Sequence, residues 1–324
     1  MKKKNVYRWM GVIVGLTIIA FVLIYFLNLQ DKVSNPTKLV DRNGPPRFSN
    51  MIYGGFGNDA LNKPMDVTKI GEFVYVSDTQ NKRVQVFDST GTQIFKFGKE
   101  GKDPGQFMFP YGIAGDKKGN IYVADLYNGN ISIVDKKGKF IRYFKEKNEK
   151  QKAIKAPGGL RIVKNKLYVT DIEKSQVFVF DLDGNLLLTI GKPGEKDGEF
   201  RAPNAATADK DGNIYVVDTG NQRVQIFDKQ GKFKKSINGS EDGKGSSTLV
   251  NPRGIAINSD GNIFVVNNLT HYIYGFDAKG KKLFQFGGMG DENEQFYLPN
   301  GLFIDDTDHI YITDTLNQRV AVYY

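Results

Sequence analysis

One phrase recurs six times along this chain, and its spacing limits the possible folds more than any other feature. Its clearest copies are YVSDTQNKRVQVFD from residue 75, YVVDTGNQRVQIFD from residue 215 and YITDTLNQRVAVYY from residue 311. The acidic or amide position recurs at intervals of 47, 46, 47, 49 and 47 residues, as Asp78, Asp125, Asp171, Asp218, Asn267 and Asp314. A proline opens each unit in the same register, as Pro64, Pro110, Pro157, Pro203, Pro252 and Pro299. A fixed period of this length indicates a repeat architecture.

Each unit holds four short segments rich in Val, Ile, Tyr and Phe, separated by turn sequences such as DKKGN. In the second unit the expected strands are 112–116, 120–125, 131–135 and 140–144. Alternation places Ile121 and Val123 on one face and Tyr122 and Ala124 on the other, so the sheet needs a neighbour on each side. Six four-stranded sheets arranged radially provide those neighbours, and the sequence therefore predicts an all-β, six-bladed β-propeller.

The sixth unit stops after its third strand, at RVAVYY. Residues 48–66, FSNMIYGGFGNDALNKPMD, match the stretch that joins a fourth strand to the next unit, as in KLFQFGGMGDENEQFYLPNG at 282–301. We therefore expect a strand near 49–53 to complete the last blade and close the ring, which protects an otherwise open strand edge. The predicted propeller spans residues 48–324.

The repeated pattern P-x-G-[IL]-A, D-x-x-G-N-I-Y-V-x-D and N-x-R-V-Q-V-F-D-x-x-G resembles the NHL repeat family of six-bladed propellers over residues 48–324. The resemblance implies the fold. It does not select one activity, because similar propellers serve as RNA binders, protein scaffolds, sensor domains, and lyases or lactonases.

The N-terminus has a different character from the repeats. Residues 1–8 carry four positive charges, and the uncharged run that follows predicts a transmembrane signal anchor at 9–28 with a linker at 29–47. The charge bias predicts a cytoplasmic N-terminus and a propeller outside the cytoplasmic membrane. Of the net charge of +9, this basic tail supplies +4, and the remaining +5 is modest for a nucleic-acid binder.

The sequence D-T-x-N-x-R is complete in three units, where an Asp and an Arg five residues apart can pair across a tight turn. We interpret it as a structural motif, formed by Asp78, Asn81 and Arg83, by Asp218, Asn221 and Arg223, and by Asp314, Asn317 and Arg319. The units that lack it have turns that either drifted or present binding groups. The candidates there are Tyr127, Glu173, Asn268, His271 and Tyr272.

A second group of candidate residues follows the unit-opening prolines, at the expected mouth of the central channel. They are Asp66, Tyr111, Asn204, Arg253 and Asn300, with Arg161 on the innermost strand of the third blade. Mixed polar, charged and aromatic groups around a channel suit a ligand or peptide, and they equally suit a water-filled channel. The connecting loops also differ, since 145–157 is basic and 287–299 is acidic.

Chemistry beyond binding has little support in the sequence. The chain has no cysteine and only two histidines, His271 and His309, so thiolate sites and three-histidine zinc sites are excluded. No metal site is predicted, although channel carboxylates could hold calcium as in similar lactonase-like propellers. We therefore predict a membrane-anchored, extracytoplasmic scaffold for a protein or an envelope component, with nucleic acid disfavoured. The alternative is a calcium-dependent lyase or lactonase-like enzyme with His271 as its base.

Overall fold

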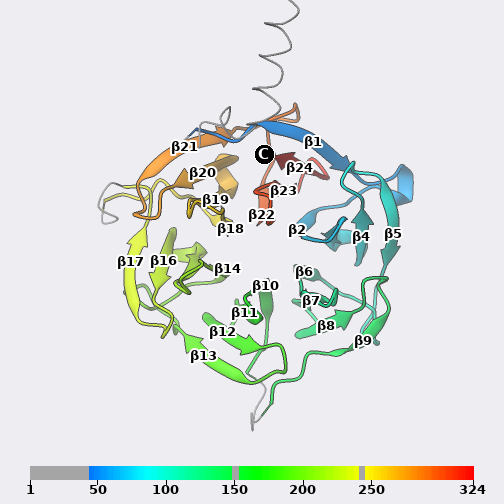
Figure 1. The fold of residues 1–324 in the computed structure, drawn as a ribbon, viewed down its shortest axis with the longest axis horizontal. Helices are drawn as coiled ribbons and strands as arrows, with labels where there is room; N and C mark the ends of the chain where they lie inside the picture. The colour runs from blue at the N-terminus through cyan, green and yellow to red at the C-terminus, as the bar shows by residue number, and fades with distance from the viewer. Residues whose placement is uncertain (1–43, 148–152, 241–244) are drawn as a thin grey trace, which may run out of the picture. The chain divides into compact units, whose positions relative to one another are not determined.

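Alternating apolar residues within each repeat generate six radial sheets in the computed structural model, which describes residues 44–147, 153–240 and 245–324. The innermost strands converge on a common axis, and the outermost strands lie along the circumference (Figure 1). The structure confirms a six-bladed propeller of four-stranded blades. Pro46–Tyr324 forms one compact unit.

The strands follow the repeats in order from the axis outwards, with every neighbouring pair antiparallel. Blade 1 contains β2 (Pro64–Ile70), β3 (Phe73–Asp78), β4 (Arg83–Phe87) and β5 (Gln93–Phe97). Blade 2 contains β6 (Pro110–Gly115), β7 (Ile121–Asp125), β8 (Asn130–Val134) and β9 (Phe140–Tyr143). Blade 3 contains β10 (Pro157–Val163), β11 (Lys166–Asp171), β12 (Gln176–Asp181) and β13 (Leu186–Ile190).

The other three blades repeat this order. Blade 4 contains β14 (Pro203–Ala208), β15 (Ile214–Asp218), β16 (Arg223–Phe227) and β17 (Phe233–Ile237). Blade 5 contains β18 (Pro252–Ile257), β19 (Ile263–Asn267), β20 (Tyr272–Phe276) and β21 (Lys282–Gly287). Blade 6 contains β22 (Pro299–Ile304), β23 (Ile310–Asp314), β24 (Arg319–Tyr323) and β1 (Phe48–Tyr53). Single 3₁₀ turns are η2 (Gly57–Asp59), η3 (Thr79–Asn81), η4 (Thr219–Asn221) and η5 (Asn268–Thr270).

The sixth sheet takes its outermost strand from the beginning of the ring. β1 pairs with β24 from Phe48 opposite Tyr323 to Tyr53 opposite Arg319. Two hydrogen bonds between the backbones of Arg47 and Tyr324, at 2.9 and 3.0 Å, extend this ladder. Both chain ends of the propeller therefore belong to one blade.

The hydrophobic core consists of six clusters, each formed between two neighbouring blades. β7 illustrates how the sequence produces this arrangement. Ile121 and Val123 pack in the cluster shared with blade 1, whereas Tyr122 and Ala124 pack in the cluster shared with blade 3. Alternation along one strand thus joins three blades, because successive side chains point to opposite faces of the sheet.

The two ends of the ring carry different connections. We call one end the loop face; it carries the blade-to-blade loops and the turns between second and third strands. The other end is the turn face, which carries the turns between first and second strands at 71–72, 116–120, 164–165, 209–213, 258–262 and 305–309.

The predicted cytoplasmic tail, membrane anchor and most of the linker lie outside the described residues. Within the described part of the chain, no helix is both long enough and apolar enough to span a bilayer.

Candidate functional site

One buried polar side chain per blade organises the loop face. It is the last residue of the second strand, and its carboxylate or amide oxygen accepts a hydrogen bond from the backbone of the loop that precedes the same blade. All six side chains have no exposed surface: Asp78, Asp125, Asp171, Asp218, Asn267 and Asp314. The residue that marks the sequence repeat is therefore a clamp that fixes each connecting loop to its blade.

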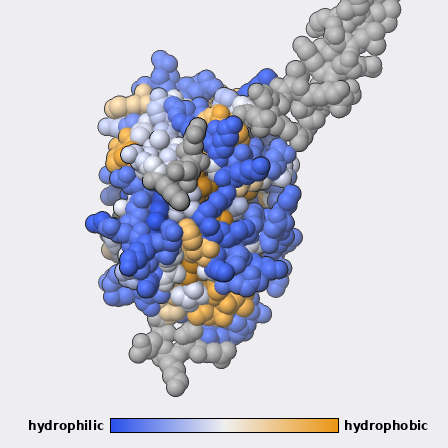
Figure 2. Space-filling model, turned by 90° about the vertical axis from the view of Figure 1, so that its left-hand side faces the viewer, coloured by the Kyte–Doolittle hydropathy of each residue, from blue (hydrophilic) through white to orange (hydrophobic). Residues whose placement is uncertain are grey.

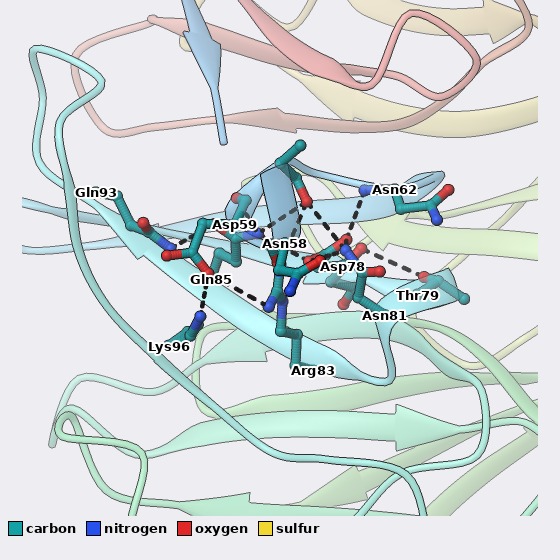
Figure 3. Close-up of polar contacts among 12 residues, drawn as sticks. Asn58, Asp59, Asn62, Asp78, Thr79, Asn81, Arg83, Gln85, Gln93 and Lys96 are labelled. Carbon is teal, nitrogen blue, oxygen red and sulfur yellow. Dashed lines mark hydrogen bonds and ion pairs between the residues drawn. The ribbon is translucent and has the colours of Figure 1, made fainter. Parts of the chain in front are cut away.

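In blades 1, 4 and 6 the clamp is strengthened by the rest of the D-T-x-N-x-R sequence, as Figure 3 shows for blade 1. Asp78 accepts hydrogen bonds from the backbone of Asn62 at 2.7 Å, from Arg83 Nε at 2.6 Å and from Gln85 Nε2 at 2.8 Å. Arg83 Nη2 also donates to the carbonyl of Asn58 at 2.8 Å. The motif is structural in this geometry, because its groups are occupied by one another and by the loop backbone.

The same geometry recurs in blades 4 and 6. Asp218 accepts hydrogen bonds from the side chains of Asn221 and Arg223 at 2.9 Å each. Asp314 accepts hydrogen bonds from those of Asn317 and Arg319 at 2.8 Å each. Burial is the largest influence on Asp314 and raises the pKa of this carboxyl, while its hydrogen bonds and the Arg319 charge oppose the rise.

A contact between blades was not anticipated from the sequence. The hydroxyl of the Thr that follows the clamp donates to the carbonyl of the next blade's opening proline, from Thr79 to Pro110, Thr219 to Pro252 and Thr315 to Pro64. These distances are 2.6, 2.7 and 2.9 Å. The recurring D-T pair was its signal, and the bond ties the turn after a second strand to the innermost strand of the next blade.

In the turns that lack the motif, the candidate residues differ in how deeply they are buried. Asn268 is buried and takes the place of the threonine, donating to the carbonyl of Pro299 at 2.7 Å. Tyr272 is half-buried and stacks on Tyr274, and Glu173 forms an exposed ion pair with Lys155. Tyr127 is 68% exposed, so among these turn candidates it is the aromatic side chain most open to a partner.

His271 has a defined hydrogen-bonding state. Its Nδ1 accepts the backbone N–H of Leu298 at 3.1 Å, and its ring contacts that of Tyr297. Burial lowers the pKa of His271, which favours the neutral ring. A neutral imidazole has one basic nitrogen, and here that nitrogen is already occupied. As placed, His271 holds the loop before β22 and has no free lone pair for use as a general base.

The residues at the start of the inner strands meet across the axis of the ring. Asn204 Nδ2 donates to the Tyr111 hydroxyl at 2.8 Å, and that hydroxyl lies 3.3 Å from Asn300 Oδ1. Asp66 accepts the backbone N–H of Ile113, in the neighbouring blade, at 3.0 Å. These contacts connect blades 1, 2, 4 and 6 through side chains that are at most 6% exposed.

Arg161 completes this central network from blade 3. Its Nη2 donates to the carbonyl of Leu302 at 2.8 Å, and its guanidinium lies 5.3 Å from the Phe303 ring centroid. Burial lowers the pKa of Arg161 and raises that of Asp66 to about 6, and each charge partly offsets the shift of the other. Arg161 Nη1 is buried without a hydrogen-bond partner in the described structure.

The channel is nearly closed at this level. A Cβ added to Gly112 would lie 2.3 Å from the carbonyl oxygen of Gly158, and one added to Gly301 would lie 2.6 Å from that of Met65, so neighbouring inner strands touch through glycine. The cavity that remains, of about 20 Å³, has room for roughly one water molecule. Asp66, Tyr111, Arg161, Asn204 and Asn300 line it, whereas Arg253 does not. These five lining residues together form a polar plug that closes the channel.

The plug fits calcium poorly. Calcium takes six to eight oxygen ligands and favours several carboxylates, whereas this cavity has the single carboxylate of Asp66, with the positive charge of Arg161 nearby. Within the described ranges, no three or more His, Asp or Glu residues are grouped as metal ligands.

Three aromatic rings in contact, those of Tyr111, Phe109 and Tyr127, lead from the plug to the outer surface of the loop face. We call them the aromatic step. The Tyr111 ring stacks on Phe109 with centroids 6.2 Å apart, and Phe109 contacts the exposed Tyr127 at 4.7 Å. Lys82 Nζ lies 5.7 Å from the Phe109 centroid. Further exposed apolar residues in loops of this face are Phe56, Val250, Leu269, Met289 and Tyr297. The wall that carries β17 and β21 is mainly hydrophilic, with small separate apolar patches (Figure 2).

Comparison with known proteins agrees with this architecture. A family model described as a 6-bladed beta-propeller matches residues 146–223. Protein brain tumor of Drosophila melanogaster is 29% identical over 173 residues, which is 53% of this chain and 16% of that protein. Protein lin-41 of Caenorhabditis elegans is 50% identical over 46 residues, which is 14% of this chain and 4% of that protein. The chain thus matches only a small part of these relatives.

Solved structures share the fold at low identity. A protein of unknown function from Bacteroides thetaiotaomicron has a TM-score of 0.62 and 14% identity, covering 86% of this chain and 74% of its own. A catalytically inactive virginiamycin B lyase from Staphylococcus aureus, solved with quinupristin, has a TM-score of 0.58 and 13% identity, covering 86% and 88%. Identities this low support the propeller fold alone.

Proposed function

We propose that this protein is a membrane-anchored, extracytoplasmic scaffold that binds a protein partner through its loop face. Residues 9–28 would hold it in the cytoplasmic membrane, with the N-terminus inside and the propeller outside. The NHL-like repeats and the part-length similarity to Protein brain tumor support a binding propeller.

The observation that carries the proposal is the aromatic step beside a closed channel. The loop face has at its axis a cavity with room for about one water molecule, which is too small for a substrate. It offers instead Tyr127 on Phe109, with Lys82 beside them. Exposed aromatic residues supported by packing and flanked by a cation are typical anchors of protein interfaces.

Affinity capture from cross-linked cells tests this proposal with the full-length chain. Tyr127→Ala should reduce recovery of the partner at least tenfold, because an anchor tyrosine contributes about 2 kcal/mol or more to binding. Tyr324→Ala is the matched control, since this tyrosine is also exposed but extends from the C-terminal end of β24. Equal recovery with Tyr127→Ala and the unchanged chain would refute a loop-face site centred on Tyr127.

The rival function is a lyase or lactonase-like enzyme, and the fold shared with virginiamycin B lyase supports it. In this structure its candidate base, His271, would first have to release the Leu298 N–H. Turnover of lactones or of quinupristin that is lost in His271→Ala, with an unchanged melting temperature, would support the enzyme.

A further inference from the structure

The turn face carries an uneven charge distribution that the loop-face function does not explain. On blades 2 to 4, turns 181–185 and 228–232 contain two lysines and three aspartates. The four turns 116–120, 135–139, 164–166 and 209–213 contain eight lysines and four aspartates. We call these lysines the lysine cluster; all eight are exposed: Lys117, Lys118, Lys136, Lys137, Lys139, Lys164, Lys166 and Lys210. The cluster lies on blades 2, 3 and 4.

Neighbouring turns of the cluster lie side by side. A Cβ built on Gly119 is 3.8 Å from Lys136 Cβ, which brings the two turns of blade 2 together. Lys164 Nζ donates to the backbone carbonyl of Lys210, which joins the turns of blades 3 and 4. Blades 2 and 3 are neighbours in the ring and share a hydrophobic cluster. The lysines therefore lie on three consecutive blades of the turn face.

The aspartates within these turns are engaged by backbone amides. Asp116 Oδ1 accepts the N–H groups of Lys118 and Asn120 at 2.8 and 2.9 Å, and Asp135 accepts those of Lys137 and Lys139 at 2.9 Å each. In the described structure, no ion pair joins a lysine of the cluster to a carboxylate. Apart from that of Lys164, which donates to the Lys210 carbonyl, the ammonium groups are therefore available to an external anion.

The opposite half of the same face is more acidic. Turns 88–92 and 277–281, on blades 1 and 5, contain two aspartates and two lysines, whereas turns 71–72, 258–262 and 305–309, on blades 1, 5 and 6, contain five acidic residues and no lysine. The acidic residues are Glu72, Asp260, Asp305, Asp306 and Asp308. A negatively charged surface would therefore attract the side of blades 2 to 4 and repel the other side, which gives the ring a preferred tilt.

The chain enters the ring at the turn face, on blade 6. Phe48 lies opposite Tyr323, and Tyr323 lies opposite Ile310, the residue after turn 305–309. The chain thus enters β1 at the turn face. The linker 29–47 has 19 residues and spans at most about 65 Å when extended. An anchor at 9–28 would hold the lysine cluster at a high local concentration near the lipid surface.

We propose that the lysine cluster binds the anionic headgroups of the bilayer, and this proposal rests on the membrane anchor of the proposed function. The four turns are rich in lysine and contain no exposed apolar side chain, which suits phosphate headgroups better than a protein interface, whose centre is depleted in lysine. Contact through the turn face leaves the loop face, with Tyr127, directed away from the lipid.

Energy transfer in proteoliposomes tests this contact with the full-length chain. The chain has no cysteine, so Asp211→Cys beside Lys210 and Gln80→Cys on the loop face each accept a single fluorophore. With an acceptor on the headgroups, transfer from position 211 should be at least twofold higher in phosphatidylglycerol-containing vesicles than in phosphatidylcholine vesicles. About 1 M NaCl should abolish the difference, because the Debye length falls to about 3 Å. Transfer from position 80 should stay low in both.

A matched pair of triple variants assigns the effect to the cluster. Lys117→Gln, Lys118→Gln and Lys137→Gln should reduce transfer to the neutral-vesicle level. Lys99→Gln, Lys102→Gln and Lys196→Gln remove the same charge from exposed loop-face positions and should leave transfer unchanged. Unchanged melting temperatures would show that both variants are folded.

The outcomes separate this proposal from the anchor on which it rests. A chain stripped from vesicles by alkaline carbonate would refute the anchor. If the chain stays in the vesicles but energy transfer is independent of lipid charge, only the lysine contact is refuted. The same holds if transfer falls equally in both triple variants. Lipid-independent transfer together with lysine-cluster-dependent binding of soluble polyphosphate would also overturn it and indicate an anionic polymer.

Discussion

Blades 1, 4 and 6 keep the complete D-T-x-N-x-R sequence, whereas blades 2, 3 and 5 have lost it, yet all six have the same clamp. Asp125 receives the backbone amides of Met108 and Phe109 at 2.6 and 3.0 Å without any arginine. Asn267 can replace the aspartate as the clamp, because its amide oxygen accepts the N–H of Val250 at 2.6 Å. The comparison shows that one buried acceptor is enough to hold the loop, and that the arginine reinforces it.

The blades without the motif also carry two of the exposed apolar residues in the turns of the loop face. Tyr127 belongs to blade 2 and Leu269 to blade 5, and their side chains are 68% and 53% exposed. In blades 1, 4 and 6 the corresponding turns are occupied by the Asp–Asn–Arg contacts. Loss of the reinforcing contacts therefore coincides with side chains that can contact a partner.

The largest expected effect concerns β1, the strand that completes blade 6 and closes the ring. Deleting residues 48–56 removes the fully buried Ile52 and exposes the edge of β24. The loss should approach the whole stability of an ordinary domain, about 5–15 kcal/mol, and can be measured by urea unfolding. Deleting residues 31–39 is the control of equal length. A 48–56 deletion that unfolds as cooperatively, and at the same urea concentration, would contradict the role of β1 in closing the ring.

The second prediction compares the two kinds of clamp directly. Asp314→Ala leaves the guanidinium of Arg319, which is 3% exposed, without its carboxylate and should cost about 3–5 kcal/mol. Asp125→Ala leaves only amide donors unpaired and should cost about 1–3 kcal/mol. Equal losses in denaturant unfolding would show that the arginine adds nothing to the clamp.

The third prediction uses pH to separate the central plug from the clamps. The folded pKa of Asp66 is raised by burial from 3.8 to about 6, so the folded state prefers the protonated carboxyl. Its contribution to stability is present below about pH 4 and is lost as pH rises through about 6. A shift of this size corresponds to about 3 kcal/mol at most.

Unfolding of the unchanged chain and of Asp66→Asn at pH 4 and pH 7.5 measures this contribution. The variant should gain stability relative to the unchanged chain as pH rises. A difference between the two proteins that is constant with pH would show that Asp66 keeps an ordinary pKa.

The smallest expected effect concerns the contact between blades. Thr219→Val removes the hydrogen bond to the Pro252 carbonyl and should cost about 1 kcal/mol. Thr189→Val, at an exposed position on β13, should change the free energy of unfolding by less than about 0.5 kcal/mol. Similar changes in the free energy of unfolding for both variants would show that the Thr219 hydrogen bond does not stabilise the ring.

The repeat period predicted the six blades, because the blades depend on local sequence that recurs. Residues such as Asp66, Tyr111 and Asn204 were also placed near the axis by their position after the prolines. Their closure into a plug could not be predicted, since it depends on how closely glycines such as Gly112 let the inner strands approach. The occupied Nδ1 of His271 depends likewise on a backbone amide 27 residues away, at Leu298.

A photo-crosslinking amino acid placed at Tyr127 in the full-length protein, in intact cells, tests the central claim most directly. Leu187, on the outer strand of blade 3, is the control position because it is also exposed, at 49%. We predict adducts with the same one or two proteins from position 127 and none of them from position 187. No protein adduct from position 127, or the same adducts from both positions, would contradict a loop-face scaffold.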